Sequence, residues 1–317
     1  MILTKTPYRV SFFGGGTDYP EWFNENEGSI LSTSIAHYCY IHGRILPPFF
    51  AYKYRIVWSK IEQTIELNEI EHPVLREAIK LMNFDFGMEI HHHGDLPARS
   101  GLGSSSAFSV GMLHMLHILN GEPPTKKQLA KEAILLEKDI LKETVGVQDQ
   151  IATAHGGINK IKISRSGDFQ ITSIDLSADR TSTFEESILL FYTGVSRFAS
   201  DIAKKQVLAI PKNINALNEM QKLVDIASDI LANGNDLDDF GRLLDETWKL
   251  KRGLESSITP SFIDDIYSKA ISAGALGGKL LGAGGGGFII FYVPEGFKQS
   301  VLTALAELLN VPFTIDY

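Results

Sequence analysis

The sequence of 317 residues contains one cysteine, no long apolar run and no block of like charges. Because Cys39 stands alone, the chain can form neither an internal disulfide nor a cluster of cysteine ligands around a metal, and a reducing compartment fits this. No segment approaches the ~20 uninterrupted apolar residues that a membrane helix needs. Lys5, Pro7 and Arg9 interrupt the first apolar run, which is not typical of a secretory leader. We therefore expect a cytoplasmic protein without a membrane partner.

Charge and composition narrow the function further. The net charge of −8 and the lack of a basic block argue against a nucleic-acid partner. Neither property excludes a local basic pocket. The three adjacent histidines are a weak metal signal, because only His91 and His93 share a face of a strand and no carboxylate stands at ligand spacing. The length and the 44% apolar content predict one large globular domain or two packed ones.

Short β-type runs and amphipathic helical patterns alternate irregularly along the chain. Strands are expected early in the sequence and again near residues 159–164 and 187–194. Helices are expected over residues 107–119, over 125–143 with Thr125 as the N-cap, and over most of 198–275. Because there is no strict βαβ rhythm, the pattern predicts an α+β fold, with domains at residues 1–185 and 186–317.

The segment "PARSGLGSSSAFS", residues 97–109, places glycines and serines directly before a helix. It is neither a Walker A loop nor a dinucleotide fingerprint, because the required lysine and third glycine are missing. Glycines permit close backbone approach, and the N–H groups and dipole of a helix start attract anions. A serine hydroxyl there can also ligate Mg²⁺. The residues alone leave two interpretations, a phosphate-binding loop and a plain serine-capped turn.

Two further glycine clusters flank this segment in sequence. The cluster at 281–292 is either a tight bend before a buried strand or a place where backbone approaches a ligand or the loop at 97–109. In the cluster at 9–23, Asp18 either caps a helix that begins at Pro20 or accepts hydrogen bonds from sugar hydroxyls.

Two acidic residues stand out between the segment at 97–109 and the cluster at 281–292. Glu137 falls within the apolar arc of its helix, where a carboxylate is costly unless a cation or a salt bridge compensates it. Asp149 follows the helix at a turn, where it could orient or deprotonate an attacking hydroxyl.

The three glycine segments in this order, with an aspartate between the second and the third, resemble the GHMP small-molecule kinases along nearly the whole chain. The segments that carry the resemblance are "PARSGLGSSSAFSVG" and "GGKLLGAGGGGFIIF". The resemblance implies two α+β domains, of which the N-terminal one contains a left-handed βαβ unit and the C-terminal one is ferredoxin-like. It also implies ATP and Mg²⁺ as cofactors.

The same resemblance assigns roles to residues. Asp149 and Arg9 would be catalytic, and Ser105 and Glu137 would ligate Mg²⁺. The expected ATP-binding residues are Pro97, Arg99, Ser100, Gly101, Leu102, Gly103, Ser104, Ser105 and Ser106. The expected substrate-binding residues are Gly15, Gly16, Thr17, Asp18, Arg197, Lys251, Gly284 and Gly285. Of these, Arg197 and Lys251 would bind a distal phosphate, although Lys251 could equally lie on a solvated helix face.

Within the family, the segments "TPYRVSFFGGGTDYPEW" and "YTGVSRFASDI" are most similar to the D-glycero-D-manno-heptose 7-phosphate kinases. That likeness implies phosphorylation of the anomeric hydroxyl of a sugar phosphate to the 1,7-bisphosphate, a step of GDP-heptose synthesis. Gly14–Gly16 replace the Gly-Glu-His of galactokinase and leave room for a larger sugar. The alternatives are a kinase for an unphosphorylated sugar such as fucose or galactose, and a non-catalytic binding protein. A homodimer is compatible with the sequence.

Overall fold

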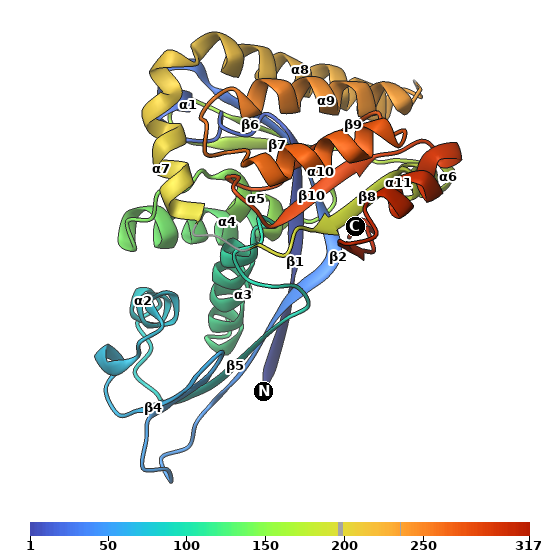
Figure 1. Cartoon of the computed structure of the whole chain (residues 1–317). Coiled ribbons are helices and arrows are strands. Elements are labelled where there is room, and N and C mark those ends of the chain that lie inside the picture. The colour runs from blue at the N-terminus through green and yellow to red at the C-terminus, as the bar shows by residue number, and fades with distance from the viewer. Residues whose placement is uncertain (196–198, 235) are drawn as a thin grey trace. The chain divides into compact units, whose positions relative to one another are not determined.

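The computed structural model describes residues 1–195, 199–234 and 236–317 (Figure 1). The chain divides into two compact units that are interleaved in sequence. The first unit consists of Met1–Tyr8, His37–Ala98 and Gly103–His155, and the second of Arg9–Ala36, Arg99–Leu102 and Gly156–Tyr317. Strands β1 (Ile2–Phe13) and β2 (Gly28–Ile45) each contribute one part to either unit. No described helix has the length and apolar character needed to span a bilayer.

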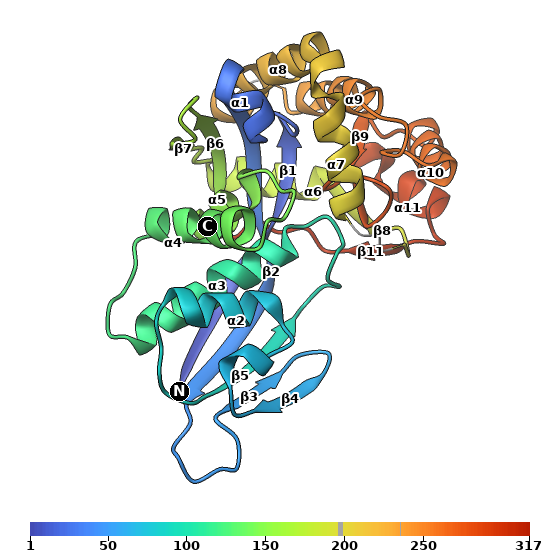
Figure 2. The same cartoon turned by 90° about the vertical axis from the view of Figure 1, so that its left-hand side faces the viewer.

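The first unit is a sheet covered by helices. The sheet has the order β4-β3-β5-β2, in which β3 and β5 run parallel and the other neighbours antiparallel. The remaining elements are β3 (Tyr54–Val57), β4 (Ile61–Thr64), η1 (Leu67–Glu69), α2 (Pro73–Leu81), β5 (Met88–Gly94), α3 (Ser104–Leu119), α4 (Lys126–Ile134), η2 (Leu135–Ile140) and α5 (Gln148–His155). Figure 2 shows α2 and α3 side by side over these strands.

Helix α3 is the central element of the first unit, since it packs against α2, α4, η2 and α5. Gly111 lets it approach β1 closely, because a Cβ there would lie 2.8 Å from the Thr6 hydroxyl. The Thr4 hydroxyl donates to the Gly111 carbonyl over 3.0 Å and fixes this contact. The helix start, where the phosphate loop was predicted, is thereby held by the core of the unit.

The second unit contains two sheets. The first part of β2 pairs with β6, which pairs with β7, and a separate antiparallel sheet has the order β11-β8-β10-β9. The elements are α1 (Pro20–Asn26), β6 (Ile158–Ile163), β7 (Phe169–Ser173), α6 (Ala178–Ser187), β8 (Ile188–Tyr192), α7 (Ala199–Ala209), η3 (Ile210–Lys212), α8 (Ile214–Ala232), α9 (Asp238–Arg252), α10 (Ser261–Ser272), β9 (Gly277–Leu280), β10 (Phe288–Tyr292), η4 (Glu295–Phe297), α11 (Lys298–Ala304) and β11 (Leu309–Val311).

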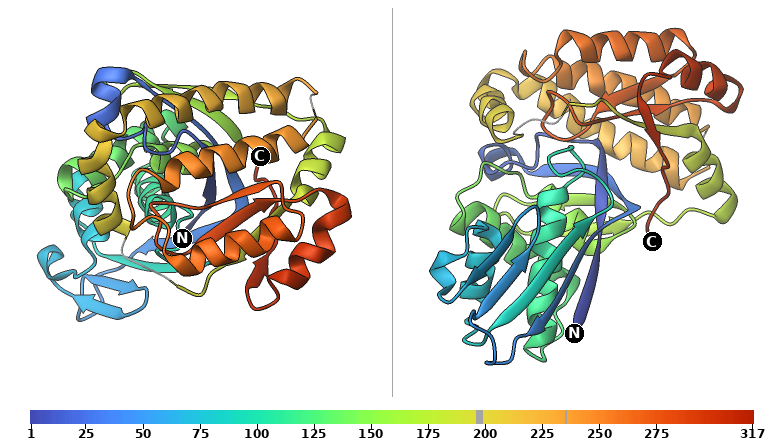
Figure 3. Two further views of the ribbon diagram at one scale, coloured as in Figure 1. Left: turned by 45° about the horizontal axis from the view of Figure 1, so that its top comes forward. Right: turned by 60° about the horizontal axis from the view of Figure 1, so that its bottom comes forward.

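Helices α9 and α10 pack on β9, and α8 packs along α9, as Figure 3 shows. Edge-to-face aromatic contacts hold the core beneath: the Phe12 ring lies 5.8 Å from that of Phe184 and 5.2 Å from that of Phe240. Such pairs contribute roughly 0.5–1.5 kcal/mol each beyond the burial of their area. The last residues of β1, which precede the first glycine cluster, are therefore fixed in this core.

Several expected elements differ in detail from those observed. Helix α3 begins at Ser104 rather than at residue 107, because Gly103 takes a left-handed φ of 70° and serves as the N-cap. Thr125 caps α4 as predicted, but the expected helix over 125–143 changes to π-helix at Leu135. The helix beginning at Pro20 is confirmed, whereas the capping role for Asp18 is wrong, since the N-cap is Tyr19.

The close packing of α9 on β9 generates the first prediction. A Cβ at Gly277 would lie 2.1 Å from the Gly241 carbonyl and 2.5 Å from the Asp245 amide nitrogen. We expect Gly277→Ala to lower the free energy of unfolding by about 2–3 kcal/mol in a urea titration, because the helix must shift to admit the methyl group. Gly296→Ala is the control, since nothing lies within 4 Å of that position. Equal stability of the two variants would contradict the packing.

Candidate active site

The start of α3 presents the backbone of the second glycine segment. The N-cap Gly103 provides no side-chain cap, and the Ala107 amide donates to the Gly103 carbonyl over 2.9 Å. The plain serine-capped turn is therefore wrong for this segment. The first turn of a 16-residue helix directs its N–H groups and its partial positive charge to whatever lies before it.

Glu137 lies fully buried in the π-helical turn η2, a type of turn that is frequent at functional sites. Its Oε2 accepts hydrogen bonds from the Ser106 hydroxyl over 3.0 Å and from the Gln150 amide over 2.5 Å. Burial raises the pKa of the Glu137 carboxyl to about 7, although the neighbouring Ser109, Gln150 and Ser106 side chains favour the charged form. Ser105, the predicted metal partner of Glu137, has an exposed side chain, and its role stays a prediction.

The donor set around Glu137 fits a hard cation. Glu137 Oε1 is buried and has no hydrogen-bond partner in the part of the chain that the structure describes. Carboxylate and hydroxyl oxygens are the ligands that Mg²⁺ prefers, together with phosphates and water. The described residues contain no cluster of three histidine, cysteine or acidic side chains that could hold a metal. An ion at Glu137 would thus depend on phosphate oxygens for much of its coordination.

Asp149 lies in the first turn of α5, one position before Gln150. The Gln148 amide donates to its Oδ1 over 3.2 Å, and the Thr153 hydroxyl donates to its carbonyl over 2.8 Å. Its side chain is partly exposed, so it can reach a ligand, while Gln150 beside it is buried against Glu137. One short helix therefore positions both the predicted base and a hydrogen-bond partner of the predicted metal ligand.

In the second unit, Arg9 is buried and bonded to the second glycine segment. Its Nη1 donates to the Gly101 carbonyl over 2.6 Å, and its amide donates to the Leu102 carbonyl over 3.0 Å. The structure thereby brings a predicted catalytic residue into contact with the predicted ATP loop. Pro97 and Arg99 of that loop are exposed, and Arg99 takes a left-handed φ of 60°. The buried Ser100 hydroxyl has no partner among the described residues.

The third glycine segment packs directly on the second. A Cβ at Gly287 would lie 2.3 Å from the Ser100 carbonyl, and one at Gly282 would lie 2.6 Å from the Gly101 Cα. The Phe288 amide also donates to the Ser100 carbonyl over 3.0 Å. Close approach to the loop at 97–109, one of the two interpretations of this cluster, is therefore confirmed. Gly284 and Gly285 instead adjoin Ile258, whose carbonyl accepts from the Gly285 amide over 2.9 Å.

The first glycine segment is tied down by Thr17 and Asp18. The buried Thr17 hydroxyl donates to the Gly14 carbonyl over 2.8 Å, and Asp18 Oδ1 accepts from the Gly16 amide over 3.0 Å. Gly15 has open space beside it, since a Cβ there would meet only the Ser11 hydroxyl, at 3.8 Å. Open space is found at Gly15 alone among these three glycines, since a Cβ at Gly14 would lie 1.9 Å from the Ser29 carbonyl oxygen and one at Gly16 would lie 3.0 Å from Leu217.

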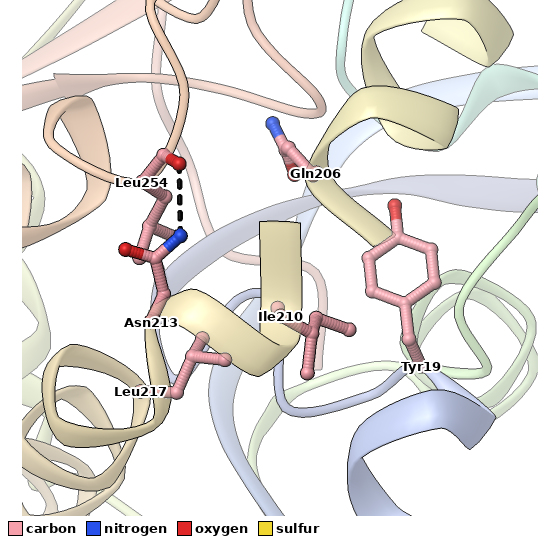
Figure 4. Close-up of a pocket in the computed structure, with 7 residues that line it drawn as sticks. Tyr19, Gln206, Ile210, Asn213, Leu217 and Leu254 are labelled. Atoms are coloured by element: carbon pink, nitrogen blue, oxygen red, sulfur yellow. Dashed lines mark hydrogen bonds between the residues drawn. The ribbon is translucent and has the colours of Figure 1, made fainter. Parts of the chain in front are cut away.

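A pocket adjoins this segment in the second unit (Figure 4). Tyr19 and Gln206 lie on one side of it, and Asn213 and Leu217 on the other. The Asn213 amide donates to the Leu254 carbonyl over 2.9 Å and closes one edge. The remaining lining residues are Gly16, Ile210 and Leu254. The Gln206 amide donates to the Ala283 carbonyl, which links this lining residue to the third glycine segment.

Two cations expected at a distal phosphate have different outcomes. Arg197 lies outside the described residues. Lys251 is buried in α9 rather than on a solvated face, and its Nζ donates to the Gly282 carbonyl over 2.6 Å. The solvated-face interpretation is thus wrong for Lys251, whereas Lys249 is exposed and paired with Asp245.

Sequence reasoning missed Lys279, to which it assigned no role. The side chain is fully buried, and its Nζ donates to the Phe12 carbonyl over 2.8 Å. Burial lowers the pKa of Lys279 well below its ordinary value, and Lys251 and Arg9 lower it further, while Asp18 opposes them. A lysine between glycines and leucines of a buried strand was the signal that could have identified it.

The chain is similar to several known kinases. Two family descriptions match the chain, "GHMP kinases N terminal domain" over residues 70–157 and "GHMP kinases C terminal" over residues 219–310. A D-glycero-alpha-D-manno-heptose 7-phosphate kinase of Campylobacter jejuni is 26% identical over 96% of this chain and 93% of its own length. A galactokinase of Pyrococcus furiosus is also 26% identical, over 96% of this chain and 92% of its own.

The L-fucokinase/L-fucose-1-P guanylyltransferase of Bacteroides fragilis is 29% identical over 91% of this chain, which spans 34% of that longer protein. Among solved structures, a D-glycero-D-manno-heptose 1-phosphate kinase from Bacteroides thetaiotaomicron superposes with a TM-score of 0.82. It is 23% identical and covers 100% of this chain and 96% of its own. The likeness to that structure confirms the two-domain α+β fold, while the boundary at residues 185 and 186 stays a prediction.

Burial of Glu137 generates a prediction on pH and stability. In the metal-free protein the folded state keeps this proton up to about pH 7, whereas the unfolded chain loses it near 4.5. Stability should therefore fall by about 3 kcal/mol as the pH rises from 4 to 8, and Glu137→Gln should remove that loss. Urea titrations at several pH values in the presence of a chelator measure how the free energy of unfolding depends on pH in the unaltered protein and in Glu137→Gln. Asp139→Asn, an exposed change nearby, is the control, and an unchanged slope in Glu137→Gln would refute the assignment.

Proposed function

Because the chain belongs to the GHMP kinases and is an ATP-dependent sugar kinase, we propose that it phosphorylates the anomeric hydroxyl of D-glycero-D-manno-heptose 7-phosphate. The product would be the 1,7-bisphosphate. The observation that carries the proposal is the likeness to the Campylobacter jejuni kinase over 96% of the chain. The first glycine segment supports it at Gly15, which has open space where a side chain would otherwise project, whereas Gly14 packs against the Ser29 carbonyl.

We assign the binding of the ATP phosphates to the segment from Pro97 to Ser106 and the start of α3. Glycine-permitted backbone N–H groups and the helix dipole would stabilise the phosphate charge without a P-loop lysine. Glu137, with Ser105 or Ser106, would hold Mg²⁺, which neutralises charge on the transferring phosphates. The buried Oε1 of Glu137 supports this role, because it has no hydrogen-bond partner among the described residues.

Phosphoryl transfer then needs mainly positioning and charge stabilisation. The anomeric oxygen attacks the γ-phosphorus in line, the new P–O bond forms, and the bond to the ADP oxygen breaks. Asp149 accepts the hydroxyl proton or orients the hydroxyl. Arg9 would stabilise the transferring group, since its guanidinium is buried and already directed to the Gly101 carbonyl in the ATP loop. A modest base suffices, because an anomeric hydroxyl is more acidic than an ordinary alcohol.

For the acceptor sugar we propose the pocket beside Gly16, with Thr17 and Asp18 holding its hydroxyl groups. Gly15, Gly284 and Gly285 would adjoin the sugar through their backbone. Arg197 and Lys251 would bind the distal phosphate, because a phosphate ester requires charged donors. A cytoplasmic location and a homodimer remain part of this proposal.

A second candidate is a kinase for an unphosphorylated sugar, favoured by the likeness to the galactokinase over 92% of its length. Steady-state assays with ATP and a panel of heptose 7-phosphate, heptose, fucose and galactose separate the two. We expect the greatest kcat/KM with heptose 7-phosphate and a rise of roughly tenfold or more in its KM in Arg197→Ala. The KM for unphosphorylated heptose should not change. An equal rise in the KM values of Arg197→Ala for heptose 7-phosphate and heptose would exclude the phosphate-binding role of Arg197. A greater kcat/KM with fucose or galactose would favour the second candidate.

Removal of the base tests the mechanism itself. Asp149→Asn keeps the size of the side chain but cannot accept the proton, so kcat should fall roughly 10²–10⁴-fold. The dissociation constant of ATP, measured by calorimetry, should stay nearly unchanged, because Asp149 is assigned to the acceptor hydroxyl. Near-normal turnover in this variant would contradict the assignment.

A further inference from the structure

The buried amine of Lys279 has no role in the mechanism above. It lies on β9, is 1% exposed, and donates to the Phe12 carbonyl over 2.8 Å. Phe12 stands two residues before Gly14, the first glycine of the first glycine segment, and β9 leads directly into the third. A single side chain thus ties the strand that enters one glycine segment to the strand that enters the other.

Two other buried cations of the second unit make the same kind of contact. Arg9 donates to the Gly101 carbonyl in the second glycine segment, and Lys251 donates to the Gly282 carbonyl in the third. Each of the three basic side chains therefore donates to a backbone carbonyl within or just before a glycine segment. A carbonyl carries only a partial charge, so these contacts orient the backbone without neutralising the cations.

The charged groups around Lys279 come from three elements. Arg9 on β1 and Lys251 on α9 oppose a positive charge on its amine, and Asp18 before α1 favours it. The residue paired with it on β10 is Ile290, which is uncharged. Full burial adds a desolvation cost that an apolar side chain of the same size would avoid. Stability alone gives no reason for a lysine here, whereas a function at the glycine segments does.

We propose that Lys279 is a positioning residue of the kinase, which fixes the entry to the first glycine segment and gains a proton when a phosphate oxyanion binds near Arg9 and Lys251. The inference rests on the proposed kinase site. The oxyanion has two sources, a phosphate of the nucleotide and the phosphate of the sugar. Its negative charge would offset the repulsion from the two neighbouring cations, which stabilises the ammonium form of Lys279.

The test follows the amine directly, by NMR titration of the full chain labelled at the lysine side-chain carbon next to the amine. The Lys279 signal is assigned by its loss in Lys279→Arg. Without ligand it should titrate well below the other lysines. Saturating AMP-PNP with Mg²⁺, or heptose 7-phosphate alone, should raise its midpoint by roughly one pH unit or more. The ligand that raises the midpoint identifies the source of the oxyanion, either the nucleotide or the sugar phosphate. An unchanged midpoint in both arms, with binding verified by calorimetry, overturns the proposal.

Kinetics supply the second readout. Lys279→Met should lower kcat roughly 10- to 100-fold, because a small displacement of the reacting groups is costly, with a smaller effect on the KM for ATP. It should also change the pH dependence of kcat, which a purely structural role would not. Lys249→Met on the exposed face of α9 is the matched control. Normal kcat in Lys279→Met refutes the positioning role. If heptose 7-phosphate is not a substrate but AMP-PNP raises the titration midpoint of Lys279, the proposed substrate is wrong and the proposed role of Lys279 is supported.

Discussion

Direct contact between two backbone segments is the constraint on which the second unit depends. Residues 99–102 and 281–288 approach so closely that a Cβ at Gly101, Gly282 or Gly287 would overlap the opposite main chain. Such an approach removes side chains from the site and leaves amides and carbonyls as its surface. The chemistry then falls to groups brought in from neighbouring elements, namely Arg9 from β1 and Lys251 from α9.

Buried charge is treated differently in the two units. In the first, Glu137 is held in a π-helical turn by a hydroxyl and an amide, and one of its oxygens has no partner among the described residues. In the second, buried basic side chains donate to carbonyls at the glycine segments. In both arrangements hydrogen bonds orient an ionisable side chain, and its burial costs desolvation free energy. A phosphate and its cation are the partners that would offset this cost.

Much of this could be predicted from the sequence, because local rules govern it. The glycine segments, the cap at Thr125 and the burial of Glu137 follow from residue type and helical period. The π-helical turn that carries Glu137 and the partnership of Ser106 with it depend on packing against α3, which no local pattern records. Lys279 could not be identified from local patterns for a related reason, since its acceptor, the Phe12 carbonyl, lies 267 residues away in the sequence. Its significance appears only when β1 and β9 are known to meet.

The interleaving of the two units has a consequence for how the chain acquires its fold. The first unit is complete once His155 has been made, whereas the second needs residues 9–36 to pair with segments that end at Tyr317. During synthesis the first unit can form early, and its parts of the two long strands, the start of β1 and the end of β2, are continuous with strand parts that belong to the second unit. Such distant pairings carry a large loop-closure cost, so assembly of the second unit should limit the folding rate. Neither unit is a contiguous stretch of sequence, and a fragment cut at any single position would leave at least one of them incomplete.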